Sequence, residues 1–180
     1  MSTRKKRMSA ADRRAQLIDV GRTVFAEVGF DQASLDLIAR RAGVTKPIIY
    51  EHFGGKDGLH AAIVQRELDA LVARVSAAMS AGTPRERFEG AVVEFLTYVA
   101  EEPDGFAVLT REAPVPSRGG MTRVIDQLTD RVGAIFGREL ARAGYDRRVA
   151  PIYATALLGM VTQAGRWWAA AGRPVSRDQV

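Results

Sequence analysis

The chain has 180 residues, 47% of them hydrophobic, which is enough to bury the core of one globular unit or of two small ones. It contains no cysteine, so a disulfide framework and thiolate metal sites are excluded. The net charge of +5 is unevenly placed: residues 1–56 hold 11 Lys and Arg against 6 Asp and Glu, whereas residues 57–180 hold 15 of each. A basic first third indicates a polyanionic partner, although a solvated basic surface would have the same composition.

Charged residues interrupt every apolar run before it reaches the roughly 18 residues that a membrane-spanning helix needs. The basic start of the chain has the charge of a signal peptide, but Asp12, Arg13 and Arg14 precede any apolar stretch. We therefore expect a cytoplasmic protein without a membrane partner. The apolar positions have helical spacing throughout, with no alternating strand pattern and no internal repeat, which predicts an all-α fold class.

The first expected helix begins at a capping box formed by Ser9 and Asp12 and ends at Gly29. Its apolar positions share one face, so it should pack behind the two helices that follow. Four consecutive basic residues precede it: Arg4, Lys5, Lys6 and Arg7. They either enter a minor groove of DNA as a flexible arm or form a solvated tail, and both alternatives stay open.

Residues 34–53 predict two short helices joined by a tight turn. Ser34 is the expected N-cap of the first, and Gly43 ends it because glycine tolerates the positive φ that such a turn needs. Thr45 is the expected cap of the second helix, and Pro47 lies in its first turn, where no backbone donor is required. Two helices in this arrangement are typical of a helix-turn-helix, which reads DNA.

The second short helix leaves several side chains pointing outward, where they could reach base edges in the major groove. Lys46 can donate to guanine O6 or N7, Glu51 can accept from cytosine N4, and Pro47 and Ile48 can contact a thymine methyl group. The alternatives are that Ile48 packs against the core and that Glu51 is a solvated surface acid.

The run from Gly43 to Leu59, GVTKPIIYEHFGGKDGL, resembles the helix-turn-helix of the TetR family of bacterial transcriptional regulators, and the similarity extends back to about Ala15. Beyond Leu59 the chain resembles the family only in length and helical layout. The resemblance implies an N-terminal three-helix helix-turn-helix domain, residues 1–55, followed by a C-terminal helical bundle that binds an effector and dimerises, residues 56–180.

DNA contacts are expected along the helix-turn-helix, from Ser34 at its start to Lys56 just beyond its second helix. The resemblance implies that His52 and Lys56, together with Tyr50, hold phosphates, and Lys56 would add its charge to a helix N-terminus. Tyr50 is also a candidate for contact with a base edge. Family members usually have an aromatic residue where this chain has Glu51. The full set of expected DNA-binding residues is Ser34, Thr45, Lys46, Pro47, Ile48, Tyr50, Glu51, His52 and Lys56.

The second domain is expected to consist of longer helices. Residues 113–120 contain two prolines and two glycines, which are incompatible with regular helix. The expected helices cover residues 56–81, 84–102, 106–111 and 121–143, and a last long one runs from a start between Asp146 and Pro151 to Gly172.

Large side chains on these helices could line a cavity for a small-molecule effector, which the family resemblance implies for this domain. At helical spacing they could equally form the core. The zero net charge and the absence of a basic cluster favour a mainly apolar ligand over a phosphorylated one. The candidates are Phe95, Tyr98, Phe106, Leu109, Met121, Ile125, Leu128, Tyr153, Met160 and Trp167.

A homodimer is also implied, because in the family two C-terminal helices form half of a four-helix bundle between subunits. Ser176 is the expected cap of a further helix, but only four residues follow it, so the second helix of that pair is either missing or outside these 180 residues. Trp167 and Trp168 cannot both face one core, so one is expected at an interface. Gly159 and Gly165 would suit close helix approach across a dimer.

Two functions of different classes remain. The first is a repressor released from its DNA operator by a small, mainly apolar ligand; the second is an architectural, nucleoid-type DNA-binding protein whose helical domain only dimerises. Enzymatic activity has little support, because the sequence has no nucleophile motif and no glycine-rich phosphate loop. No cofactor or metal is expected, since His52 and His60 lack acidic or cysteine partners at ligand spacing.

Overall fold

The computed structural model describes residues 8–110, 120–176 and 179, with the side chains of residues 84, 120–128 and 131 left aside. All regular elements in these ranges are helices, which confirms the all-α fold class. In chain order they are α1 (Ala10–Gln32), α2 (Leu35–Ala42), α3 (Lys46–Phe53), α4 (Lys56–Ala78), α5 (Pro84–Glu101), α6 (Pro103–Thr110), α7 (Gly120–Arg142), a short 3₁₀ turn η1 (Arg147–Val149) and α8 (Ala150–Ala170).

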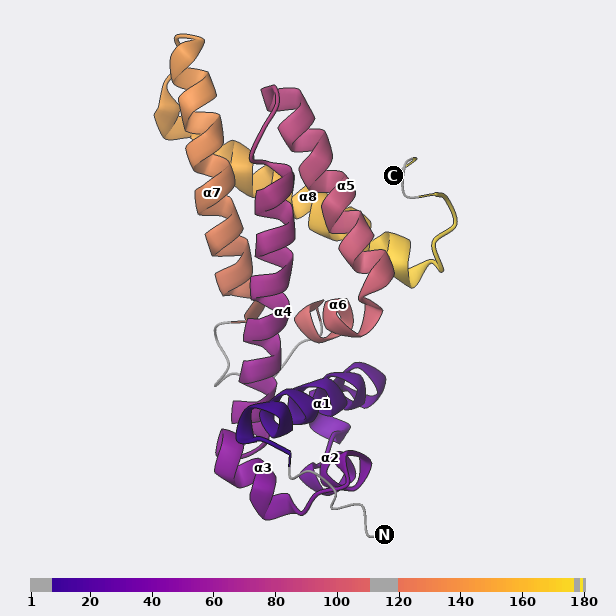
Figure 1. The fold of residues 1–180 in the computed structure, drawn as a ribbon. Coiled ribbons are helices and arrows are strands. Elements are labelled where there is room, and N and C mark those ends of the chain that lie inside the picture. Colours follow the sequence, from indigo (N-terminus) through magenta and orange to yellow (C-terminus); the bar gives the residue numbers. More distant parts are fainter. Residues whose placement is uncertain (1–7, 111–119, 177–178, 180) are drawn as a thin grey trace, which may run out of the picture.

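Helices α1 to α3, the N-terminal unit, form one end of the molecule, and α4 leads from it into the bundle of α4 to α8 (Figure 1). The predicted cap of α1 is present, because the Ser9 hydroxyl accepts from the Asp12 N–H at 3.1 Å. Gly29 was expected to end this helix. It instead interrupts helical geometry with φ of 77°, after which α1 continues to Gln32.

The bundle helices begin and end close to the predicted positions. Thr83 and Glu86 form a complete capping box at the start of α5, and Glu102 is its C-cap. The short helix α6 begins three residues earlier than expected, at Pro103. The expected irregular segment, residues 113–120, lies outside the described residues except at its last position.

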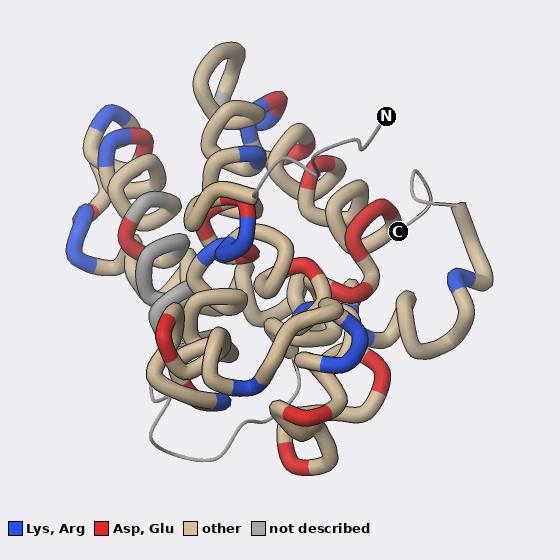
Figure 2. Tube along the Cα trace, turned by 60° about the horizontal axis from the view of Figure 1, so that its bottom comes forward, with Lys and Arg blue, Asp and Glu red and all other residues tan. Residues whose placement is uncertain are grey.

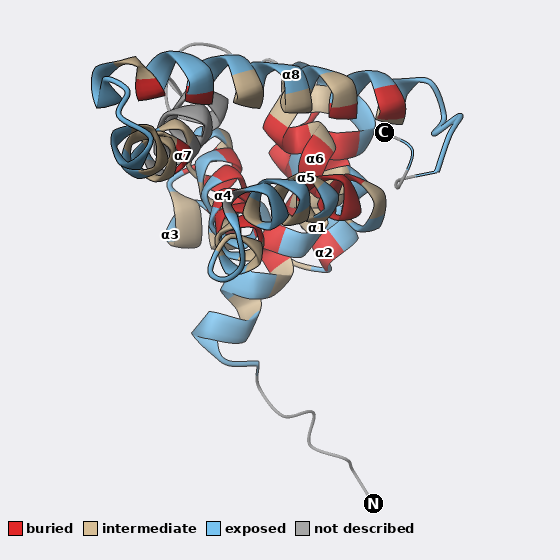
Figure 3. Ribbon diagram, turned by 90° about the horizontal axis from the view of Figure 1, so that it is seen from above, coloured by how far each residue is buried: buried red, intermediate tan, exposed pale blue. Residues whose placement is uncertain are grey.

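Helix α8 crosses α7 and α5; its inner side includes the buried residues Ala154, Gly165 and Trp168, and its outer side is exposed (Figure 3). Most of the buried hydrophobic residues form one cluster that extends from Leu17 in α1 to Trp168 in α8. Because the N-terminal unit and the bundle share this core, the predicted division at residues 55 and 56 stays a prediction.

A buried polar network lies where the N-terminal unit meets the bundle. Its centre is the carboxylate of Glu67 in α4, a residue that is only 4% exposed. The Tyr98 hydroxyl of α5 donates to it at 3.0 Å, and the guanidinium groups of Arg22 and Arg66 lie at 3.4 and 3.3 Å. A buried carboxylate is stable only with such donors, so these helices are held at defined positions.

The same network ties α1 to the end of α5 and to α6. Arg22 pairs with Glu102 at 2.7 Å, and the Thr23 hydroxyl donates to Asp104 at 3.0 Å. Burial and the neighbouring Glu67 charge raise the pKa of Tyr98, so its hydroxyl keeps its proton and remains a donor.

We predict that Gly105→Ala disturbs this network. A Cβ at position 105 would overlap Glu67 Oε2 and lie 2.6 Å from Tyr98 Oη. Urea unfolding should show a loss of about 1–3 kcal/mol, as for other overpacked sites. Gly133→Ala is the matched control, because its Cβ would have no neighbour closer than 3.8 Å. Equal effects of the two substitutions would contradict the proposed tight packing.

Candidate DNA interface and ligand cavity

The turn between α2 and α3 is built by backbone geometry. Gly43 has φ of 65°, and its N–H bonds to the carbonyls of Ala39 and Arg40, which closes α2. Thr45 is the N-cap of α3 by position, although its side chain makes no capping hydrogen bond. Ile49 is fully buried and anchors α3 to the core, so the opposite side of α3 is presented outward.

The structure brings the nine expected DNA-binding residues to the end of the molecule formed by the N-terminal unit. Six of them are exposed: Ser34, Thr45, Lys46, Pro47, Tyr50 and Glu51. His52 and Lys56 are half-buried, and so is Ile48, which was expected to point outward but packs against the core cluster. The Ser34 hydroxyl accepts from the Leu37 N–H, so its confirmed place is that of a helix cap.

Both candidate lysines have partners within the chain. Lys46 lies 3.1 Å from Asp36 in an exposed ion pair, which is worth at most about 1 kcal/mol and could exchange for a DNA acceptor. Lys56 donates to the Asp31 carbonyl at 3.3 Å and lies 4.4 Å above the Phe30 ring. Lys56 therefore also ties the start of α4 to the C-terminal end of α1.

The positive charge of the N-terminal third is concentrated before α1. Of its 11 Lys and Arg, four are Arg4, Lys5, Lys6 and Arg7, which lie outside the described residues. The remaining seven are nearly balanced by six Asp and Glu in the same third of the chain. Figure 2 shows basic and acidic positions interspersed on this side of the molecule. Residues 8–56 therefore carry a net charge of +1 (7 − 6), and Arg4, Lys5, Lys6 and Arg7 supply the other four of the +5.

His60, the second histidine, has a packing role. It is 5% exposed, and its ring makes edge contacts with Phe25 and Phe30, each at 5.0 Å between centroids. Burial lowers the pKa of His60, so the neutral ring is favoured beneath the start of α4.

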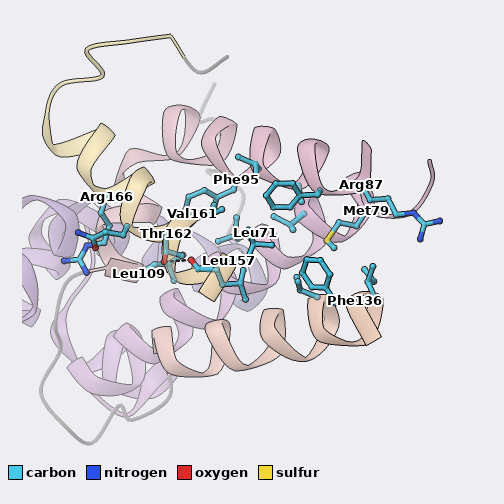
Figure 4. Close-up of a pocket in the computed structure, with 18 of the residues that line it drawn as sticks. Leu71, Met79, Arg87, Phe95, Leu109, Phe136, Leu157, Val161, Thr162 and Arg166 are labelled. Atoms are coloured by element: carbon cyan, nitrogen blue, oxygen red, sulfur yellow. Dashed lines mark hydrogen bonds between the residues drawn. The ribbon is translucent and has the colours of Figure 1, made fainter. Parts of the chain in front are cut away.

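The bundle encloses a cavity of about 240 Å³ (Figure 4). Each of α4 to α8 contributes to its walls, which are mainly apolar. The larger apolar lining residues are Leu71 and Val75 of α4 and Met79 at its C-cap, Phe88, Val92 and Phe95 of α5, Phe106 and Leu109 of α6, Val132, Ile135 and Phe136 of α7, and Leu157, Leu158 and Val161 of α8.

Three of the ten expected ligand-binding residues, Phe95, Phe106 and Leu109, line this cavity. Three others belong to α7, and their side chains lie outside the described part of the chain: Met121, Ile125 and Leu128. Tyr98 is not in the wall, because it is turned toward Glu67 on the other side of α5.

The placement of the α8 candidates in the cavity was wrong. Tyr153, Met160 and Trp167 recur every seven residues, and this stripe is 56–65% exposed. The inner side of α8 is instead formed by Leu157, Leu158 and Val161. Leu71 and Val75 of α4 and its C-cap residue Met79 were missed, although their spacing by four made their common face visible in the sequence.

The two tryptophans face opposite ways, as expected. Trp168 is 3% exposed and donates from Nε1 to the Val175 carbonyl, whereas Trp167 is 56% exposed. Gly165 was expected at a dimer contact. It lies instead against Phe95 within the chain, where an added Cβ would be 2.6 Å from the Phe95 ring.

Comparisons with known proteins agree with this fold. The chain matches the family model of bacterial regulatory proteins of the tetR family over residues 17–63, and that of the tetracyclin repressor-like C-terminal domain over residues 81–180. It is 31% identical over 179 residues to the HTH-type transcriptional activator FasR of Mycolicibacterium smegmatis. This match covers 97% of this chain and 80% of FasR.

Solved structures give the same result. A TetR-like transcriptional regulator from Rhodococcus sp. RHA1 has a TM-score of 0.75 at 29% identity, over 96% of this chain and 91% of that one. FadR from Bacillus subtilis, in complex with stearoyl-CoA, has a TM-score of 0.77 at 18% identity, over 91% and 90% of the two chains.

The protein therefore belongs to the TetR family of bacterial transcriptional regulators, whose DNA-reading motif occupies α2 and α3. None of the helices in the described ranges is long and apolar enough to cross a membrane. The described side chains also contain no group of three or more His, Asp or Glu suited to a metal ion.

We predict different defects for the two candidate lysines. Lys46→Ala should relax the preference at one base position and cost roughly 1–3 kcal/mol, because Lys46 is exposed at the start of α3, the helix expected to enter the major groove. Lys56→Ala should weaken binding to all sequences about equally and reduce the salt slope by about one. Fluorescence anisotropy on single-base variants of a selected operator, over a salt series, measures both. A change of preferred operator in Lys56→Ala would contradict this division of roles.

Proposed function

We propose that the protein is a sequence-specific transcriptional regulator whose affinity for its operator is controlled by a small, mainly apolar ligand in the bundle cavity. One observation carries the proposal: α4, α5 and α6, which form walls of the cavity, are the helices tied by the buried network to α1. In the form that we propose, the ligand loosens the operator complex and the protein acts as a repressor. FasR is named an activator, so the ratio of operator Kd values with and without ligand decides whether the ligand loosens or tightens the operator complex.

The walls of the cavity support an apolar ligand. Leucine, valine, phenylalanine and methionine side chains dominate the lining, and burying them against a ligand contributes about 25 cal/mol per Å² of apolar surface. FadR from Bacillus subtilis shares the fold and was solved with stearoyl-CoA, whose acyl chain is long and apolar. A ligand with an extended apolar part is therefore the candidate for this chain.

Helices α5 and α6 each contact the cavity on one side and the buried network on the other, and this provides the proposed route from ligand to DNA. On α5, Phe95 lines the cavity and Tyr98, three residues later, bonds to Glu67. On α6, Phe106 lines the cavity while Gly105 lies against the same carboxylate. A ligand that displaces these walls would displace the network, and with it α1 and the adjoining start of α4.

The functional species is proposed to be a two-fold dimer on a near-palindromic operator, since one α3 can contact only a few base pairs. The exposed side of α8 supplies an apolar surface for it, with Ile152 at 68%, Met160 at 65% and Trp167 at 56% exposure. Light scattering on the free protein and sequencing of DNA selected by it test this proposal. A monomer that selects a single non-palindromic half-site would overturn it.

We predict that operator DNA weakens ligand binding, because two linked equilibria change by the same factor. Calorimetric titration with dodecan-1-ol, an uncharged apolar probe, should give a lower affinity for the operator complex than for the free protein. Equal affinities would show that cavity occupancy is not linked to DNA. A thermal-shift screen in which no apolar compound binds would favour an architectural DNA-binding protein instead.

A second prediction concerns the coupling itself. Tyr98→Phe keeps the ring but removes the donor to Glu67, so the ligand should alter operator affinity by a smaller factor than in the wild type. Tyr145→Phe is the matched control, because Tyr145 is 68% exposed. The measurement is the ratio of operator Kd values with and without dodecan-1-ol. An unchanged ratio in Tyr98→Phe would show that the buried network does not transmit the effect of the ligand to the DNA-binding unit.

A further inference from the structure

Two arginines line the apolar cavity, and they lie at opposite ends of it: Arg87 of α5 and Arg166 of α8 (Figure 4). A cation is costly beside apolar walls unless a partner or water satisfies it. Arg166 is exposed, so water can solvate it. Arg87 differs: it is half-buried, and its Nε–H is shut off from solvent and has no hydrogen-bond acceptor among the described residues.

The acids around Arg87 are already engaged with other groups. Glu139, which lines the same cavity, pairs with Arg142 at 2.7 Å. Glu89 pairs with Arg85 at 2.6 Å, and Glu86 accepts from the Thr83 N–H at 2.7 Å. Within the described part of the chain, no carboxylate forms an ion pair with Arg87. Its charge is therefore available at one end of an otherwise apolar cavity.

We propose that Arg87 binds an anionic group at the end of an apolar ligand, so that the cavity takes an amphipathic carboxylate rather than a neutral hydrocarbon. The inference rests on the proposed function, because it assigns the ligand class and orientation in the same cavity. The apolar body of the ligand lies along Phe88, Phe95 and Leu109, and its carboxylate accepts from the Arg87 guanidinium.

This orientation places the charged group at the end of the cavity formed by Arg87, Met79 and Phe136 (Figure 4). The apolar end of the ligand then points toward Phe106 and Leu109 of α6, the helix that contacts α1. Chain length would decide how far the ligand reaches toward α6, while the carboxylate would fix its position. Specificity for the head group and response to chain length are thus assigned to opposite ends.

Calorimetric titration of the full-length protein with dodecanoate and dodecan-1-ol tests the assignment, since the two probes share one chain and differ in head-group charge. Wild type should bind dodecanoate about tenfold more tightly or better, the range expected for a hydrogen bond to a charged group. Arg87→Met, which keeps the length of the stem, should bring the ratio near one and change dodecan-1-ol affinity by less than about threefold. Arg87→Lys, which keeps a cation, should retain part of the preference, and Arg166→Met is the matched control that should retain all of it.

The outcomes separate the two levels of the argument. Absence of binding by both probes to correctly folded wild type, checked by circular dichroism, would overturn the proposed function and this inference with it. Equal affinity of wild type for the two probes would overturn the inference alone and leave an apolar ligand in place. Loss of the preference in Arg166→Met instead of Arg87→Met would show that the head group lies at the opposite end.

Discussion

The carboxylate of Glu67 is a charge placed in the interior, and the arrangement of the helices around it follows from the need to satisfy it. Tyr98, Arg22 and Arg66 supply the donors, from α5, α1 and α4. Removing one partner of a buried charge typically costs about 3–5 kcal/mol, whereas a full set of donors roughly offsets its desolvation. Small independent movements of α1 or α5 are therefore unfavourable, and these helices are expected to change position together or to break the network.

The position of this network next to the cavity gives it a functional meaning. The cavity walls and the network share helices. On α5, Phe95 of the wall and Tyr98 of the network are about one turn apart, and on α6, Gly105 beside the network and Phe106 of the wall are consecutive. A packed core of this kind responds to a ligand by moving between discrete arrangements rather than by deforming gradually. In the proposed function, the N-terminal unit would receive this change through α1 and through the continuous helix α4.

Local signals in the sequence were sufficient for most helix ends and for the DNA-reading motif. The Ser9, Ser34 and Thr83 caps and the Gly43 turn depend on a few neighbouring residues, so they could be predicted without the fold. Gly29, which was interpreted as a helix end, does leave helical geometry with φ of 77°, and the chain then re-enters helix as far as Gln32.

The cavity depended on contacts that sequence spacing does not reveal. Periodicity shows that one side of α8 differs from the other, but it does not show which side packs against α7. The large aromatic residues Tyr153 and Trp167 suggested the side that is in fact exposed. The ion pair of Arg22 with Glu67 joins residues 45 apart, and the role of Tyr98 as its neighbour follows only from the fold. Arg87 likewise became a candidate only from the structure, where its Nε is buried without an acceptor among the described residues.

The most direct test of the account is the separation of the two recognition helices with and without a ligand in the cavity. Because the chain has no cysteine, Glu51→Cys supplies one thiol per protomer on the exposed side of α3 for a spin label. Pulsed electron paramagnetic resonance should show one distance distribution for the free dimer and a shifted one with saturating dodecanoate, with a smaller shift when Tyr98→Phe is added. A distribution that stays the same on saturation would contradict the claim that the cavity controls the DNA-reading helices.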